Sequence, residues 1–178
     1  MIKLHLGCGQ NILPGFINCD LYSKGDFISQ IDAIVLPFKD STVDVIYACH
    51  ILEHFSRHEI VDVLSEWCRV LKKGGELYIA VPNFEAIANH YLKYHDVEVI
   101  QGLLNGGQDC DWNKHIVSFD FAYIKKCLDA AGFCDVSLYD YKDFDVFADH
   151  DDFSQAYLPH MDRENGTLMS LNIECKRR

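Results

Sequence analysis

The residues best placed to bind a ligand lie within the first twenty positions of the chain. An apolar run over residues 2–6 ends at Gly7 and Gly9, and a second apolar run over residues 16–19 is followed by Asp20. A buried strand that ends in Gly-x-Gly lets the backbone approach a ligand, because glycine has no side chain in the way. A carboxylate after the next strand can accept hydrogen bonds from both hydroxyls of a ribose. The pattern therefore predicts a site for a nucleoside-containing cofactor.

The glycine motif differs from the dinucleotide-binding pattern Gly-x-Gly-x-x-Gly. Ile12 stands where the third glycine would be, and only nine residues, from Gly7 to Gly15, separate the two apolar runs. A parallel crossover usually needs about a dozen residues or more. We therefore expect a short or distorted helical turn between the two strands. A tight turn in an ordinary α/β domain is the alternative.

Strands and helices alternate along the chain, which places the ends of successive strands at one edge of a sheet. Predicted strands cover residues 2–6, 16–19, 27–31, 43–48, 76–81, 135–139 and 167–174, the last two as an antiparallel pair. Predicted helices cover residues 56–71, 83–95 and 120–131. This order is typical of an α/β fold with a mostly parallel sheet and helices on both faces.

Capping residues support the three helices. Ser56 and Glu59 have the spacing of a capping box, and Asn83 is a suitable N-cap for the second helix. Gly132 follows the third helix, where a glycine commonly ends the last turn.

Length and composition limit the kind of protein. A chain of 178 residues with 49% hydrophobic and 24% charged residues is expected to form one globular domain, residues 1–178. The formal net charge of −11 argues against a nucleic-acid partner, since phosphate contacts need clustered lysine and arginine. No stretch approaches the roughly 20 apolar residues of a membrane helix, so no membrane partner is expected.

The eight cysteines show neither C-x-x-C pairs nor the spacing of zinc ligands. Most stand in apolar segments, where a free cysteine behaves as a small hydrophobic residue. We therefore predict reduced thiols and no metal site. The chain opens on a strand pattern instead of a signal peptide, and together these features predict a cytoplasmic location.

Several motifs in order resemble one enzyme family. They are Leu-His-Leu-Gly-Cys-Gly at residues 4–9 with Pro-Gly-Phe-x-Asn-x-Asp at 14–20, Leu-Pro-Phe at 36–38, Leu-Glu-His at 52–54, Arg-Val-Leu-Lys-x-Gly-Gly at 69–75 and Ala-Gly-Phe at 131–133. The chain resembles the class I S-adenosylmethionine-dependent methyltransferases, in particular a small type-11-like branch. The motifs are dense over residues 4–82, and the similarity continues more weakly to the C-terminus.

The resemblance implies a Rossmann-like seven-stranded sheet, parallel except for its last strand, with the cofactor S-adenosylmethionine across the carboxyl ends of the early strands. S-adenosylhomocysteine would be the product. The glycines would approach the methionine part, Asp20 the ribose and Asp32 the adenine amino group. The full set of implied cofactor residues is Leu6, Gly7, Cys8, Gly9, Asp20, Leu21, Asp32, Ala33, Cys49 and His50. Asp20 and Asp32 have a plainer alternative, which is to cap turns.

Two departures from the family concern the surroundings of the site. His5 stands where the family commonly has an acid, and the chain starts at the first strand without the N-terminal helices that often cover the cofactor. We expect residues 83–119, the acidic residues 140–166 or the second subunit of a homodimer to cover the substrate instead.

The predicted reaction is methyl transfer to a small or polar acceptor molecule. If the acceptor is a hydroxyl, His115 or His54 is the predicted catalytic base, because histidine exchanges protons near neutral pH. The plainer alternatives are that His54 orients the following helix and that His115 is a surface residue. A nicotinamide-dependent oxidoreductase and a non-catalytic cofactor-binding protein of the same fold are the rival functions.

Overall fold

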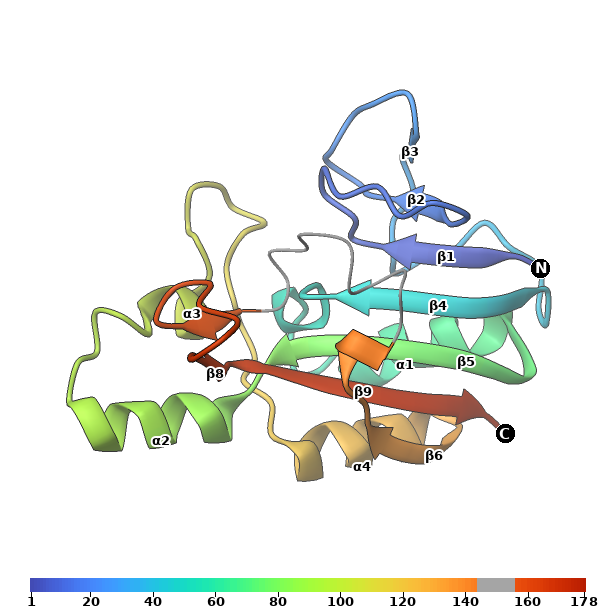
Figure 1. Ribbon diagram of the computed structural model, residues 1–178. Helices are drawn as coiled ribbons and strands as arrows, with labels where there is room; N and C mark the ends of the chain where they lie inside the picture. The colour runs from blue at the N-terminus through green and yellow to red at the C-terminus, as the bar shows by residue number, and fades with distance from the viewer. Residues whose placement is uncertain (144–155) are drawn as a thin grey trace.

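The computed structural model describes residues 1–143 and 156–178, and a seven-stranded sheet forms its centre (Figure 1). The strand order is β3-β2-β1-β4-β5-β9-β6. The bounds are β1 Lys3–Leu6, β2 Ile17–Cys19, β3 Ile28–Ser29, β4 Val43–Cys49, β5 Leu71–Pro82, β6 Phe133–Leu138 and β9 Ser170–Arg177. Strand β9 runs antiparallel to both of its neighbours, whereas the pairs among β1 to β5 are parallel. The predicted sheet with an antiparallel last strand is confirmed.

The three predicted helices are present as α1 Ile60–Val70, α2 Phe84–Tyr94 and α4 Phe121–Ala131. Three short helices were not predicted: η1 Leu52–His54, α3 Gln101–Asn105 and η2 Tyr141–Asp143. A separate pair of short strands, β7 Tyr157–Leu158 and β8 Thr167–Leu168, completes the elements. Within the described part of the chain, no helix combines the length and apolar character needed to cross a bilayer.

Local hydrogen bonds explain where the helices begin. The Asn83 side chain accepts from two backbone N–H groups of α2, and Asp120 accepts from the Tyr123 N–H at the start of α4. Helix α1 starts at Ile60, later than the predicted Ser56. The reason is that Ser56 Oγ accepts from the His58 N–H in a tight turn, and only the Glu59 half of the capping box forms.

The two faces of the sheet are covered differently. Apolar side chains of α1 and α4, among them Leu64 and Ile124, pack with Ile46 and Ile79 in one large cluster. The alternate residues of the same strands, such as Tyr47, point to the other face. In the buried cluster on that face, the described residues include the 3-10 helix η2 and loop residues but no α-helix.

The short connection between β1 and β2 is built from turns, and the expected helical turn is not formed there. The Asn18 side chain on β2 bonds to the backbone of this connection. Its oxygen accepts from the Leu13 N–H at 2.9 Å, and its amide donates to the Leu13 carbonyl at 3.2 Å. Nδ1 of His5 lies 3.1 Å from the same side-chain oxygen. His5 is therefore a buried partner of this turn, which explains the place of the unusual residue.

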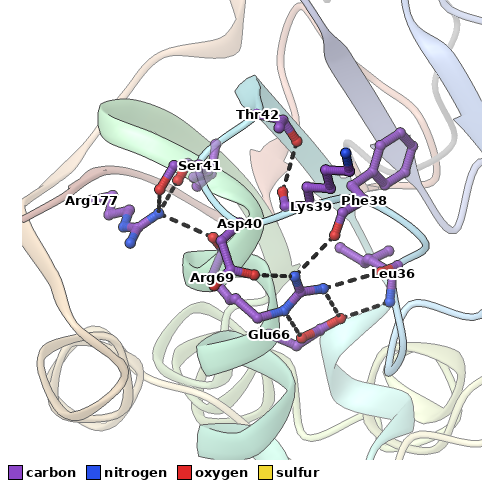
Figure 2. A network of polar contacts seen from close by, with 10 residues as sticks. Leu36, Phe38, Lys39, Asp40, Ser41, Thr42, Glu66, Arg69 and Arg177 are labelled. Atoms are coloured by element: carbon purple, nitrogen blue, oxygen red, sulfur yellow. Dashed lines mark hydrogen bonds and ion pairs between the residues drawn. The ribbon is translucent and has the colours of Figure 1, made fainter.

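Helix α1 also holds the segment that leads into β4. Arg69 donates to the carbonyls of Phe38 and Leu36 and to the carboxylates of Asp40 and Glu66 (Figure 2). Glu66 in turn accepts from the Leu36 N–H at 2.8 Å. The planar guanidinium suits this fork of acceptors. These bonds fix the backbone just after the turn at residues 32–34, which borders the site described next.

Candidate functional site

A cavity of about 600 Å³ opens at the carboxyl ends of β1, β2 and β4. This volume lies within the range of about 300–1,000 Å³ common for small-molecule sites. The sheet order reverses between β1 and β4, and ligands of open α/β sheets bind outside the strand ends at such a point. The fold therefore places the cavity where a cofactor is expected.

The structure brings most of the predicted cofactor residues to this cavity. Those that line it are Gly7, Gly9, Asp20, Leu21, Asp32, Ala33 and His50. The others, Leu6, Cys8 and Cys49, are buried behind the wall. Burial raises the pKa of the Cys8 thiol to about 12, so this group stays neutral.

Asp20 both caps a turn and lines the cavity, so the turn-capping role and a ligand-binding role are compatible. One carboxylate oxygen accepts from the Gly9 N–H at 2.9 Å. The other accepts from the N–H groups of Tyr22 and Ser23 at 2.9 and 2.7 Å. A carboxylate offers about four acceptor positions. The oxygen that contacts Gly9 therefore keeps capacity for a ligand hydroxyl.

Asp32, which also lines the cavity, has the same double role. One carboxylate oxygen accepts from the Ile34 N–H at 2.9 Å and closes a turn. The next residue, Ala33, is fixed from behind, because its carbonyl accepts from the buried indole N–H of Trp67 at 2.9 Å. Helix α1 thus sets the position of this wall of the cavity.

Residues from the irregular segment before α4 also line the cavity. Trp112 stacks on Tyr22 with ring centroids 4.3 Å apart and an interplanar angle of 13°. Both rings are 53% exposed. The stack joins the segment to Tyr22, the residue after Leu21. The segment also contributes Asp109, Cys110 and Asn113 to the lining.

Several lining residues were not predicted from the sequence. They are Tyr22, Ser23, Ile31, Ile34, Ile51, Phe55, Asp109, Cys110, Trp112 and Asn113. An aromatic residue in a polar, irregular segment is a usable signal, because binding residues are often carried by loops positioned on a rigid scaffold. Of the two expected covering segments, residues 83–119 supply lining residues, while residues 144–155 of the segment 140–166 lie outside the described part.

A cluster of histidines surrounds Glu53 at the end of the cavity beyond β4. His50 Nδ1 lies 3.0 Å from Glu53 Oε1, and His115 Nε2 lies 3.8 Å from the same oxygen. The rings of His54 and His115 are 5.0 Å apart, edge to face. His54 lines the cavity, whereas His115 lies behind it and is not part of the lining.

Burial and charge act in opposite directions in this cluster. Burial alone would raise the pKa of the Glu53 carboxyl, but the charges of the surrounding histidines and the bond to His50 hold it below its ordinary value. Burial lowers the pKa of His115, against the attraction of Glu53. The cluster thus combines an ionised carboxylate with a histidine that tends to be neutral.

Comparisons with known proteins agree with this geometry. A family model described as a methyltransferase domain matches residues 19–79. Three similar solved structures are S-adenosylmethionine-dependent methyltransferases from Thermotoga maritima, Archaeoglobus fulgidus and Methanosarcina mazei. No curated protein matches the chain.

The three structures share the fold across almost the whole chain. The Thermotoga protein has a TM-score of 0.65 at 16% identity, covering 99% of this chain and 82% of its own. The Archaeoglobus protein has a TM-score of 0.58 at 18% identity, and the match covers 98% of this chain and 85% of that protein. The Methanosarcina protein has a TM-score of 0.61 at 15% identity, and the match covers 98% of this chain and 91% of that protein.

Proposed function

We propose that this chain, a class I S-adenosylmethionine-dependent methyltransferase, methylates a small polar acceptor bound beside the histidine cluster. The family match over residues 19–79 and the fold give the cofactor, S-adenosylmethionine, and the product, S-adenosylhomocysteine. The observation that carries the acceptor proposal is that one cavity is lined both by cofactor-type residues and by polar side chains not assigned to the cofactor, namely His54, Asp109 and Asn113.

The residues present fit the cofactor. Gly9 has no atom within 4 Å of the position its Cβ would occupy, so its backbone is open to a ligand. The carboxylate next to it, Asp20, is assigned to the ribose hydroxyls. Leu21, Asp32 and Ala33 are assigned to the adenine end, and Gly7 with His50 to the methionine end.

The acceptor's proton is assigned to the histidine cluster. S-adenosylmethionine supplies a methyl group on a sulfonium, which an acceptor lone pair takes by in-line displacement, so alignment provides much of the rate. His54 Nδ1 lies 3.0 Å from the Lys114 carbonyl, which can only accept a hydrogen bond. The neutral ring therefore keeps its lone pair on Nε2, where a proton from the acceptor can be received. His115 is assigned a supporting role, because its Nε2 lies 3.8 Å from Glu53 Oε1 and the residue does not line the cavity.

The acceptor class follows from charge and size. The net charge of −11 disfavours a polyphosphate chain, and a cavity of about 600 Å³ has limited space beside a nucleoside cofactor. We assign a small molecule as substrate, in a single domain that acts in the cytoplasm. A homodimer whose second subunit covers the open side is the corresponding assembly.

Cofactor binding is the direct test of this proposal. S-adenosylhomocysteine at about 100 times its dissociation constant is expected to stabilise the folded protein by roughly 2.7 kcal/mol, because it binds only the folded state. A thermal melt with and without ligand measures the shift, and NAD serves as the comparison ligand. A folded sample that shows no shift at millimolar S-adenosylhomocysteine would contradict the assignment.

A pair of glycines separates the cofactor contact from backbone strain. Gly9 and Gly15 have φ of +54° and +78°, and both have open space at the Cβ position, but only Gly9 lines the cavity. Alanine at either position is expected to destabilise the fold by roughly 1–2 kcal/mol. Only Gly9→Ala is expected to weaken S-adenosylhomocysteine as well. Calorimetry on both variants tests this, and equal affinities would place the ligand away from Gly9.

A further inference from the structure

Three side chains from two distant segments converge behind the acceptor end of the cavity. Glu53 and His54 belong to η1, and His115 comes from the segment before α4. Backbone bonds join the two segments, because the Glu53 carbonyl accepts from the N–H groups of Ile116 and Val117 at 2.8 and 3.3 Å. One potential ligand atom from each of the three side chains lies within 4.8 Å of the others.

His54 and His115 are both held through Nδ1, which leaves Nε2 of each ring available as a ligand. His54 Nδ1 lies 3.0 Å from the Lys114 carbonyl, and His115 Nδ1 lies 2.9 Å from the Leu103 carbonyl. A carbonyl can only accept, so Nδ1 carries the hydrogen and the neutral ring keeps its lone pair on Nε2. A backbone carbonyl on the second ring nitrogen is the usual support of a metal-binding histidine.

Glu53 supplies the second observation. Its side chain is fully buried: Oε1 is paired with His50 Nδ1 at 3.0 Å, and Oε2 has no hydrogen-bond partner among the described residues. His115 turns Nε2 toward Oε1 at 3.8 Å. A lone pair that faces a buried carboxylate is unfavourable unless a proton or a cation lies between them.

We propose that Glu53, His54 and His115 bind one divalent transition-metal cation. Two imidazole nitrogens and one carboxylate suit zinc, manganese, iron or cobalt better than magnesium or calcium, which prefer oxygen ligands. Bonds of about 2.0–2.2 Å in a tetrahedral site place ligand atoms about 3.4 Å apart. The 3.8 Å between His115 and Glu53 is close to that spacing. The sequence predicted no metal because the third ligand, His115, lies far along the chain from Glu53 and His54.

The position of the cation also refines the acceptor, and this step rests on the proposed function. Since His54 lines the cavity, a cation held by its side chain would be reached from the cavity. A hydroxyl bound there loses its proton to water more easily, because the cation stabilises the alkoxide. The oxygen then bonds to the methyl carbon while the carbon–sulfur bond breaks and its electron pair stays on sulfur. With the cation bound, His54 Nε2 is a metal ligand and no longer the base of the metal-free proposal, the acceptor's proton goes to water, and the acceptor is assigned as a small hydroxyl compound.

Metal binding is tested without substrate or cofactor. Protein treated with a chelator is titrated with Co²⁺, followed by visible absorption, and with Zn²⁺, Mn²⁺ and Mg²⁺ by calorimetry. One equivalent of Co²⁺ with ligand-field bands is expected, with Mg²⁺ the weakest ion. His54→Ala and His115→Gln are each expected to lower the affinity at least tenfold. His58→Ala is the control, since His58 is exposed and lies outside the cluster.

The outcomes separate the two proposals. The binding of S-adenosylhomocysteine is measured for each variant in the presence of chelator. A variant that binds the cofactor is folded. Cofactor binding without any metal-dependent signal, or equal metal affinity in His54→Ala and His58→Ala, would overturn the metal site and leave the methyltransferase proposal intact. Metal binding without cofactor binding would contradict the methyltransferase proposal and leave the metal site intact.

Discussion

Asp20→Ala is expected to weaken S-adenosylhomocysteine by about a hundredfold or more, a larger loss than that caused by Asp32→Ala. Asp20 is assigned to two ribose hydroxyls, and a hydrogen bond to a charged group contributes roughly 1.5–3 kcal/mol. Its carboxylate also holds the N–H groups of Gly9, Tyr22 and Ser23. Asp32 is assigned to a single amino group.

Calorimetry on the two alanine variants gives the ranking, and Asp20→Asn separates charge from shape. The asparagine keeps one acceptor oxygen but loses the charge, so its affinity should fall between those of the wild type and Asp20→Ala. Thermal melts of the free proteins identify any loss that comes from the turn at Gly9. Wild-type affinity in a folded Asp20→Ala protein would mean that the ribose lies elsewhere.

Trp67→Ala is expected to lower the free energy of unfolding by about 3–5 kcal/mol, which is typical for a large aromatic residue removed from a core. Trp67 is fully buried in the cluster of α1 and the sheet. The variant also leaves the Ala33 carbonyl without its indole donor. Because Ala33 lines the cavity, we expect weaker S-adenosylhomocysteine binding as well.

Trp67→Phe tests the two contributions separately. Phenylalanine fills much of the indole volume but cannot donate to the carbonyl, so a loss of about 1–3 kcal/mol is expected from the unpaired group. Urea denaturation measures both variants. If Trp67→Phe matched the wild type in stability and in ligand affinity, the indole bond would have no part in positioning the turn at residues 32–34.

The local signals of the sequence were sufficient for most elements. The caps at Asn83 and Gly132 are confirmed, because each acts through bonds to residues a few positions away, and Asp120, predicted as the first residue of its helix, is the N-cap instead. The strands of the parallel sheet also lie close to their predicted positions, since they follow from runs of apolar residues. The late start of α1 could not be predicted in this way, because more than one neighbouring N–H group can donate to Ser56 Oγ. In the structure the donor is the His58 N–H.

The α/β order, the family resemblance and the glycine and carboxylate positions at the strand ends can all be predicted from local patterns in the chain. Which of those residues share a cavity, and that His5 turns away to Asn18, depends on how distant segments pack. The same packing brings His115 beside Glu53. Such neighbours depend on backbone bonds between distant segments, and no spacing within a single segment encodes them.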